Sequence, residues 1–527
     1  MIFNSLPFFA FVAVFFPLYF LLKGRMRLLW CLAGSYFFYG WWDWRFLSLI
    51  LTSTALDYYI GLRLGNTEDQ QKRKQLLWLS MVVNLGFLAF FKYFDFFVDS
   101  FEHMVLDWGW QPNWNTLNVI LPVGISFYTF QSMSYTIDVY KKQIPVETNF
   151  LRFATFIAFF PQLVAGPIVR ASDFLPQFQK DRQFEWDRLT TGLGQVLWGF
   201  FKKVAVADSL APFVDQCFAH PDSFSSMHLL VGVIFYSFQI YCDFSGYSDI
   251  AIGLARIMGF DFPDNFKTPY FSKNFSEFWT RWHITLSSWL RDYLYITLGG
   301  NRGGGFGSIF FILVPLLMLG FVVTVNAAQM LVYFGALAVA VILVRAYMRH
   351  SGKNKNKAFT YMNNMVTMLL GGLWHGASWV FVFWGFLHGL YLVGQRVFSK
   401  PFGTLLDAVR TPKVVKSGIN ILIVYSLTNL AWVFFRSPDF DTAMRVLSGI
   451  TSLDNFTFSS IINKFLVLKG FLLIGFLWSV EITDFRFHWS DTIKVNPVFR
   501  VASFALLIWL IALFGSFGAN SFIYFQF

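Results

Sequence analysis

The stretch GGLWHGASWVFVFWGFLHGL, residues 371–390, decides the fold of this chain. It is apolar and aromatic and has no aspartate, glutamate, lysine or arginine, yet it contains two histidines, His375 and His388. A helix that crosses a membrane needs about 20 apolar residues, because it rises about 1.5 Å per residue through a hydrocarbon core about 30 Å thick. An imidazole in such a helix is costly unless it faces protein or water. The two histidines therefore mark candidate functional positions.

The composition of the whole chain agrees with that reading. The 527 residues are 56% hydrophobic and only 13% charged, with a mean hydropathy of +0.52. Soluble domains carry about 25% charged residues. A soluble fold could not bury 69 phenylalanines, 20 tryptophans and 21 tyrosines, whereas lipid covers the surface of a membrane protein.

The first 27 residues have no basic segment before their apolar core and no small-residue cleavage site. We interpret them as a retained transmembrane helix rather than a removed signal peptide. The three cysteines show no metal or redox spacing, and we expect no metal site.

The net charge of +11 reflects short basic clusters between apolar stretches. The positive-inside rule predicts that these clusters lie in the cytoplasm. Attraction of an anionic cytosolic substrate is a secondary interpretation, and we expect no nucleic acid among the partners. The clusters are Lys23–Arg27, Lys72–Lys74, Lys141–Lys142, Lys202–Lys203 and the run from Arg345 to Lys357.

Apolar stretches of spanning length recur along the chain, and some contain proline or glycine. We therefore expect an all-α, polytopic transmembrane protein with about 11 to 14 membrane helices, some re-entrant or broken. No polar stretch is long enough for a soluble domain, so residues 1–527 are predicted to form a single integral-membrane domain. The stretches are 5–22, 28–41, 46–64, 76–98, 116–139, 191–207, 227–241, 308–325, 327–345, 361–376, 378–397, 418–435, 464–480 and 499–516.

Residues 308–344 contain no charge, and basic residues flank both ends. This pattern predicts an inserted transmembrane hairpin with both ends in the cytoplasm. The next helix would begin near Thr360, which places His375 roughly 22 Å along it, at membrane depth.

Position alone leaves two interpretations of His375: a neutral imidazole hydrogen-bonded between helices, or a general base at the floor of a cavity. Its neighbours Gly371, Gly372 and Gly376 favour the second, since glycine allows close backbone approach. His388 follows 13 residues later, on a different face of an ideal helix, and we assign it a structural role.

A second cluster, residues 276–304, has an apolar stripe at helical spacing and predicts an amphipathic helix at the membrane interface. An interfacial anchor explains the stripe but not His283, which follows Arg281 and Trp282. His283 is therefore a second candidate site residue. The glycine-rich loop at 299–307 lacks the Gly-Lys-Ser/Thr of a phosphate-binding loop and is interpreted as a flexible turn.

A third cluster, residues 237–260, places Asp243 and Asp249 in apolar surroundings. Asp249 and Arg256 are seven residues apart and lie near one helical stripe, which favours a structural ion pair bridged by other groups. The alternative is that Asp249 lines a substrate tunnel.

The chain has no HExxH and no GxSxG pattern. A histidine with neither a nucleophile nor a metal suits proton abstraction from a hydroxyl group. If the electrophile is an acyl thioester, such a histidine is sufficient for acyl transfer.

Several motifs together give this chain a specific resemblance. It resembles the membrane-bound O-acyltransferase family, and within it the bacterial members that O-acetylate alginate. The motifs are LPVGISFYTFQSMSYTIDVY (121–140), FFPQLVAGPIVR (159–170), QIYCDFSGYSDIAIGLARIMGF (239–260), FWTRWHITLSSWLRDYLYITLGGNR (278–302), GGLWHGASW (371–379), AWVFFR (431–436) and FIYFQF (522–527).

The resemblance implies a ring of helices around a central funnel that meets a cytoplasmic tunnel at the catalytic histidine, here His375. It implies His283 as the second polar catalytic position. We expect four further residues to contact substrate: Trp374, Trp282, Arg281 and Asp249.

The resemblance further implies a multi-pass enzyme of the bacterial inner membrane. It would move an acyl group, acetyl in the first instance, from a cytoplasmic thioester such as acetyl-CoA to an exported polysaccharide such as alginate. We expect no permanently bound cofactor, and we expect membrane lipid and an extracytoplasmic acetyltransferase as partners. Two alternatives remain open: transfer of D-alanine to teichoic acid, and a polysaccharide transporter with a structural histidine.

Overall fold

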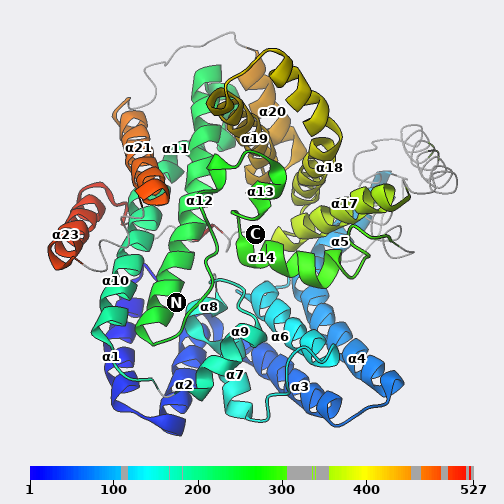
Figure 1. Cartoon of the computed structure of the whole chain (residues 1–527), viewed down its shortest axis with the longest axis vertical. Coiled ribbons are helices and arrows are strands. Elements are labelled where there is room, and N and C mark those ends of the chain that lie inside the picture. The colour runs from blue at the N-terminus through cyan, green and yellow to red at the C-terminus, as the bar shows by residue number, and fades with distance from the viewer. Residues whose placement is uncertain are drawn as a thin grey trace. The chain divides into compact units, whose positions relative to one another are not determined.

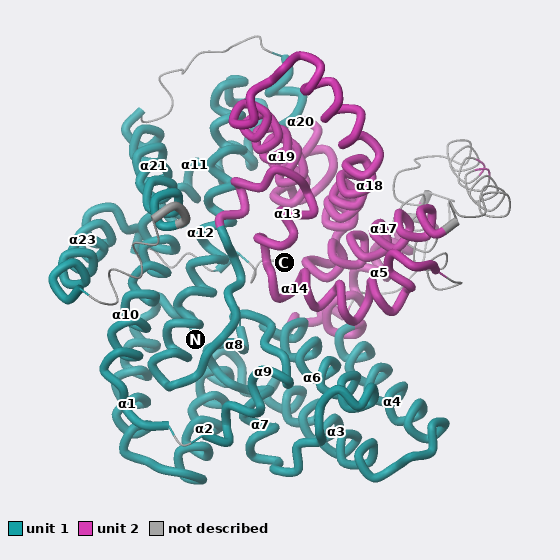
Figure 2. The backbone as a smooth tube through the Cα atoms, viewed as in Figure 1, with its two compact units in different colours: residues 1–88, 122–267, 446–527 teal, residues 89–121, 268–445 magenta. Residues whose placement is uncertain are grey.

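The structure, a computed structural model, describes residues 1–107, 117–164, 166–180, 182–304, 335, 339, 355–452, 464–487, 496–517 and 522–523. These residues form helices and no strand, as predicted (Figure 1). The chain divides into two compact units, coloured separately in Figure 2. Unit 1 comprises Met1–Leu88, Pro122–Lys267 and Val446–Phe527, and unit 2 comprises Ala89–Leu121 and Thr268–Arg445.

Unit 1 is built around the long helix α12 (Ser226–Ile257), on which α10 (Trp186–Phe200) and α11 (Asp208–Ala219) pack. A π-helical segment, η4 (Phe201–Ala207), joins those two helices and also contacts α12. The other helices are α1 (Leu6–Leu21), α2 (Gly24–Asp43), α3 (Leu47–Gly65), α4 (Gln70–Leu88), α6 (Ile125–Tyr140), α7 (Phe150–Ala158), α8 (Phe160–Leu163), α9 (Ala171–Phe174), α21 (Lys464–Phe487) and α23 (Pro497–Phe514).

Unit 2 is built around the pair α17 (Lys355–His375) and α18 (Trp379–Ala408), with α19 (Lys413–Arg436) against α18. Helix α20 (Phe440–Thr451) crosses the sequence boundary between the units. The other elements of unit 2 are the π-helical η2 (Ala89–Tyr93), α5 (Phe94–Asp107), the 3-10 helix η6 (Pro269–Phe271), α13 (Phe275–Trp279), α14 (Ile284–Trp289) and the π-helical η7 (Leu290–Tyr295).

In the described part of the chain, six helices are long and apolar enough to cross a membrane. They are Gln70–Glu102, Ser226–Ile257, Trp379–Ala408, Lys413–Arg436, Lys464–Asp484 and Pro497–Phe514. The all-α polytopic class is therefore confirmed, while the predicted total of 11 to 14 crossings stays a prediction. The predicted hairpin at 308–344 lies outside the described residues, apart from two single positions.

Helices α10 and α12 cross with their backbones almost in contact. A Cβ on Gly199 would lie 2.6 Å from the carbonyl oxygen of Gly246, and a Cβ on Gly192 would lie 2.7 Å from that of Gly253. Small residues at such crossings allow helices to approach closely, which is a common way to pack helices in a membrane. The chain uses this pairing to bring η4 and its two lysines against α12.

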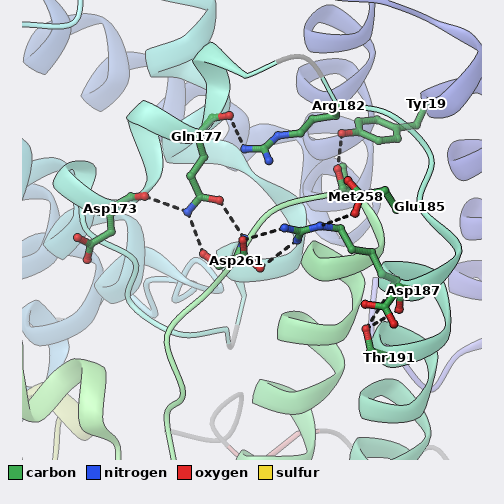
Figure 3. A network of polar contacts seen from close by, with 10 residues as sticks. Tyr19, Asp173, Gln177, Arg182, Glu185, Asp187, Thr191, Met258 and Asp261 are labelled. Atoms are coloured by element: carbon green, nitrogen blue, oxygen red, sulfur yellow. Dashed lines mark hydrogen bonds and ion pairs between the residues drawn. The ribbon is translucent and has the colours of Figure 1, made fainter. Parts of the chain in front are cut away.

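The ends of α10 and α12 are tied to the loop between α9 and α10 by a polar network (Figure 3). Arg188 of α10 forms an ion pair with Asp261 at 3.0 Å, and the side chain of Gln177 makes hydrogen bonds with the backbone of Asp261 in both directions, each at 2.9 Å. The Tyr19 hydroxyl donates to the Met258 carbonyl oxygen at 2.7 Å. These bonds hold the start of α10 and the end of α12 against the segment that follows α9 and against α1.

Candidate active site

The site begins at the crossing of α17 and α18. A Cβ on Gly372 would lie 2.2 Å from the carbonyl oxygen of Phe381, and one on Gly385 would lie 2.2 Å from that of Met368. Any side chain at these positions would push the two helices apart. The expected close approach at Gly372 is confirmed, and its consequence is a fixed position for the end of α17.

His375 is the last residue of α17, and α18 begins four residues later at Trp379. The helix is described from Lys355, five residues before the predicted start near Thr360, and it ends one residue before the end of the predicted stretch 361–376. The imidazole is 3% exposed. Its depth in a bilayer stays a prediction.

Two residues that the sequence analysis did not single out hold this helix end. The Lys92 ammonium donates to the carbonyl oxygens of Trp374 at 2.6 Å and His375 at 3.2 Å, and the Tyr93 hydroxyl donates to that of Leu373 at 2.8 Å. The last carbonyls of a helix have no partner within the helix and carry partial negative charge. A lysine is therefore well suited to them. The available signal was a single lysine within the apolar stretch 76–98.

His283 does not lie on a continuous amphipathic helix. The predicted helix is broken into α13, α14 and η7, and His283 sits at the break as the residue before α14. Its φ of +41° is left-handed, a conformation that costs energy in a residue other than glycine and persists where the surroundings impose it. The predicted interfacial stripe is also buried, with Phe278 and Trp282 fully enclosed.

The two histidines lie near each other in unit 2. Their ring centroids are 6.4 Å apart with an interplanar angle of 59°. The Trp374 ring lies 5.9 Å from His283 and 5.1 Å from His375, so it forms a wall shared by both. This spacing lets both imidazoles reach one small group. Within the described ranges, no three His, Cys, Asp or Glu side chains gather closely enough to hold a metal ion.

His388 belongs to a different helix from His375, so our argument that they occupy different faces of one helix was wrong. The fully buried His388 ring stacks on Phe278 at 5.8 Å and lies 4.6 Å from Trp384, whose ring is 5.0 Å from that of His375. Neither ring nitrogen of His388 has a hydrogen-bond partner in the described part of the chain. An imidazole enclosed by aromatic rings is consistent with the structural role predicted for it.

Two of the expected substrate residues pack within unit 2. Trp282 stacks on Phe278 and lies 5.0 Å from Trp432, which makes it part of the aromatic wall. Arg281 forms an ion pair with Glu277 at 2.8 Å and donates to the Thr268 hydroxyl at 3.0 Å. These bonds hold the chain at the helix break. Contact of either residue with substrate stays a prediction.

The fourth expected substrate residue, Asp249, belongs to unit 1. It forms an ion pair with Lys202 of η4 and accepts a hydrogen bond from Gln195 at 3.3 Å. The prediction that Arg256 is the ion-pair partner of Asp249 was wrong. The partner is Lys202, which η4 brings to α12 from a distant part of the sequence. Arg256 instead lines a cavity together with Asp249. A role of Asp249 in substrate binding stays a prediction.

Comparison with known proteins supplies the remaining observations. Residues 29–319 match the model of the membrane-bound O-acyltransferase family. A probable alginate O-acetylase of Azotobacter vinelandii is 39% identical over 88% of this chain and 80% of its own length. A peptidoglycan O-acetyltransferase of Helicobacter pylori is 34% identical over 86% of this chain and 80% of its own length. A teichoic acid D-alanyltransferase of Bacillus subtilis is 33% identical, but over 35% of this chain and 48% of its own length.

Proposed function

The chain belongs to the membrane-bound O-acyltransferase family, and on that premise we propose that it O-acetylates an exported polysaccharide. It is a multi-pass membrane O-acyltransferase. We propose further that the transferred group is acetyl and that its donor is a cytoplasmic thioester such as acetyl-CoA. We also propose that the protein lies in the inner membrane. The observation that carries the chemistry is the buried pair of His375 and His283 beside Trp374.

His375 acts as the general base. It takes the proton from the accepting hydroxyl group while the hydroxyl oxygen attacks the thioester carbonyl carbon. A C–O bond forms, the C–S bond breaks, and the leaving thiolate takes up the proton that His375 had accepted. Such proton transfer by a positioned side chain contributes roughly 10²–10⁴-fold to a rate.

The His283 ring centroid lies 6.4 Å from that of His375, and His283 would donate a hydrogen bond to the thioester carbonyl oxygen. That oxygen gains negative charge in the transition state, and a fixed donor in a buried site stabilises it. The backbone break at His283 supports this role, because it aims one side chain independently of the flanking helices. Trp374 would pack against the acyl group.

We infer the acceptor of the acyl group from the names of the relatives. Those that cover most of the chain have names that indicate acetylation of alginate or peptidoglycan. We therefore place an exported polysaccharide at the end of the reaction, with an extracytoplasmic acetyltransferase completing the transfer. D-Alanyl transfer to teichoic acid is the second candidate, since two more distant relatives carry that name.

Acetylation of the exported glycan in cells tests this proposal. His375→Ala should abolish it while the protein remains in the membrane at normal abundance. His220→Ala is the matched control, because His220 is an exposed histidine of unit 1. Normal acetylation in the His375→Ala strain would overturn the assignment of the base. D-Alanyl ester in place of acetyl ester on the wild-type product would select the second candidate.

A further inference from the structure

Six polar side chains gather inside unit 1 where α3, α4 and α6 pack on one another (Figure 1). Each helix contributes two of them, four residues apart. Side chains at this spacing lie on one face of a helix, so the three faces meet at one polar cluster in otherwise apolar surroundings. The six are Ser53 and Asp57 of α3, Ser80 and Asn84 of α4, and Ser132 and Thr136 of α6, and each is at most 1% exposed.

The carboxylate of Asp57 is at the centre of this cluster and accepts hydrogen bonds from four side chains. The Ser80 hydroxyl donates to Oδ1 at 2.5 Å, and the Thr136 hydroxyl donates to the same oxygen at 3.3 Å. Asn84 Nδ2 donates to Oδ2 at 2.8 Å, and the Ser132 hydroxyl also donates to that oxygen. An ionised carboxylate only accepts hydrogen bonds, so four donors match its charged form.

The chain supplies no cationic side chain to this carboxylate. Among the residues that the structure describes, no lysine, arginine or histidine forms an ion pair with Asp57. The buried carboxylates of α12 differ in this respect, because Asp243 and Asp249 are each paired with a lysine of η4. Buried charges in proteins are paired with an opposite charge or bind a metal ion. Asp57 therefore has one negative charge that a bound cation would neutralise.

The oxygen atoms around Asp57 are suitable ligands for a cation. A hydroxyl group that donates one hydrogen bond still has two lone pairs on its oxygen, so the serine and threonine hydroxyls can donate to the carboxylate and bind a cation together. Thr54 lies three residues before Asp57, on the neighbouring part of the same helix face. Its side chain is 0% exposed, and its hydroxyl has no hydrogen-bond partner within the described ranges. A bound cation would give this hydroxyl a partner.

The charge and the ligand type favour sodium. Oxygen ligands suit hard cations, but calcium sites commonly combine several carboxylates, whereas this cluster has one. A single carboxylate neutralises a single positive charge. The larger potassium ion is bound in its channels by rings of backbone carbonyl oxygens, and here the ligands are side chains in a compact hydrogen-bonded cluster. The expectation of no metal site rested on the spacing of the cysteines, which does not concern hydroxyl and carboxylate ligands.

We propose that one sodium ion binds between α3, α4 and α6. Asp57 supplies the negative charge, and the hydroxyl oxygens of Ser80, Ser132, Thr136 and Thr54 supply further ligands. The ion joins three helices that the cluster already brings together, and it stabilises their packing. The proposal is independent of the acyltransfer chemistry, because the histidine pair belongs to unit 2.

Thermal unfolding of the full chain in detergent tests the proposal, with sodium, potassium or choline chloride at constant ionic strength and constant pH. The melting temperature of the wild-type protein should rise by about 2 °C when about 100 mM sodium replaces choline, because an ion that binds only the folded state stabilises it. Potassium should have a smaller effect. Asp57→Asn keeps the size of the side chain and removes its charge, and it should abolish the response to sodium. The control Glu68→Gln removes an exposed carboxylate of unit 1 and should respond as the wild type does.

A second pair of variants keeps the charge of Asp57. Ser132→Ala removes one ligand oxygen and should raise the sodium concentration for half-maximal stabilisation about tenfold, which corresponds to one lost polar contact. Ser126→Ala, at another buried serine of α6 outside the cluster, should not change it.

Equilibrium dialysis with radioactive sodium measures binding directly and should give one ion per chain. This measurement on the wild-type protein keeps the proposal testable if Asp57→Asn does not fold. Absence of bound sodium, equal stabilisation by potassium, or an unchanged sodium response in Asp57→Asn would overturn the proposal. A melting temperature that depends on pH but not on sodium would assign a proton to Asp57 and would also overturn it.

Discussion

Replacing Gly372 with alanine should impair catalysis through a displacement of α17. The added Cβ would lie 2.2 Å from the Phe381 carbonyl oxygen, whereas the closest comfortable C···O contact is about 3.3 Å. The helices must therefore separate locally by about 1.1 Å, the difference between these two distances. His375 ends the same helix three residues later and would move with it.

A misplacement of about 1 Å at a reacting group can cost about 10²-fold in rate. Overpacking of this kind costs typically 1–3 kcal/mol in the free energy of unfolding, which a membrane protein of ordinary stability tolerates. We therefore expect folded, inserted Gly372→Ala protein whose thioester turnover is about 100-fold below that of the wild type.

The control is Gly394→Ala on α18, where the added Cβ would meet only a side-chain atom of Phe398 at 3.9 Å. This substitution should leave turnover unchanged, and it should stabilise the helix slightly because alanine has the higher helix propensity. Turnover of purified proteins in detergent is the assay, with thermal unfolding as the check on folding. Gly372→Ala turnover within twofold of wild type, or an equal loss in Gly394→Ala, would refute the argument.

Three further predictions follow from the helix ends and the topology. Lys92→Gln should lower thioester turnover about tenfold, because the carbonyl oxygens of Trp374 and His375 lose a charged donor. The control Lys74→Gln, on the exposed surface of α4, should not change turnover. A cysteine at position 353 should resist an impermeant thiol reagent in intact cells, since the basic run from Arg345 to Lys357 is predicted to be cytoplasmic, and strong labelling would place it outside. Deletion of 308–344 with the flanking basic residues kept should preserve thioester turnover in detergent; normal donor binding without turnover would make that segment part of the active site.

The sequence predicts the long apolar helices well. The starts of α18, α19, α21 and α23 lie within five residues of the predicted apolar stretches. A lipid-facing helix must satisfy its backbone internally and present apolar side chains all round, so the local sequence is sufficient to reveal it. The full length of α12 was difficult to predict, because it depends on residues far away in the sequence. Only residues 227–241 were predicted as a spanning stretch, yet α12 continues without a break to Ile257 and includes the helical stripe of Asp249 and Arg256.

The half of α12 that was not predicted as a spanning stretch carries Asp243 and Asp249. In a hydropathy pattern, these charges indicate the end of a span. Lys203 of η4 lies 2.7 Å from Asp243, and Lys202 neutralises Asp249. Those partners are 40 and 47 residues away in the sequence, so no local pattern could reveal that the charges are compensated. The buried ion pairs form only when the fold brings η4 against α12.

The residues of the candidate site were also predicted only in part. His375 stood out because an imidazole among glycines and tryptophans is unusual in an apolar run. Lys92 was missed because its role depends on carbonyl groups 282 and 283 residues later in the chain. The helix break at His283 was missed because the apolar stripe around it fits an ideal helix, and the left-handed φ of a single residue leaves no periodic signal.

The most direct test of the central claim separates donor binding from chemistry in purified protein. The claim is that His375 removes the acceptor proton and does not hold the donor. In His375→Ala, the Kd for acetyl-CoA should stay within twofold of the wild-type value, while single-turnover transfer to a hydroxyl acceptor should fall by about 10²–10⁴-fold. Transfer at the wild-type rate in His375→Ala, or a loss explained entirely by weaker donor binding, would contradict the account.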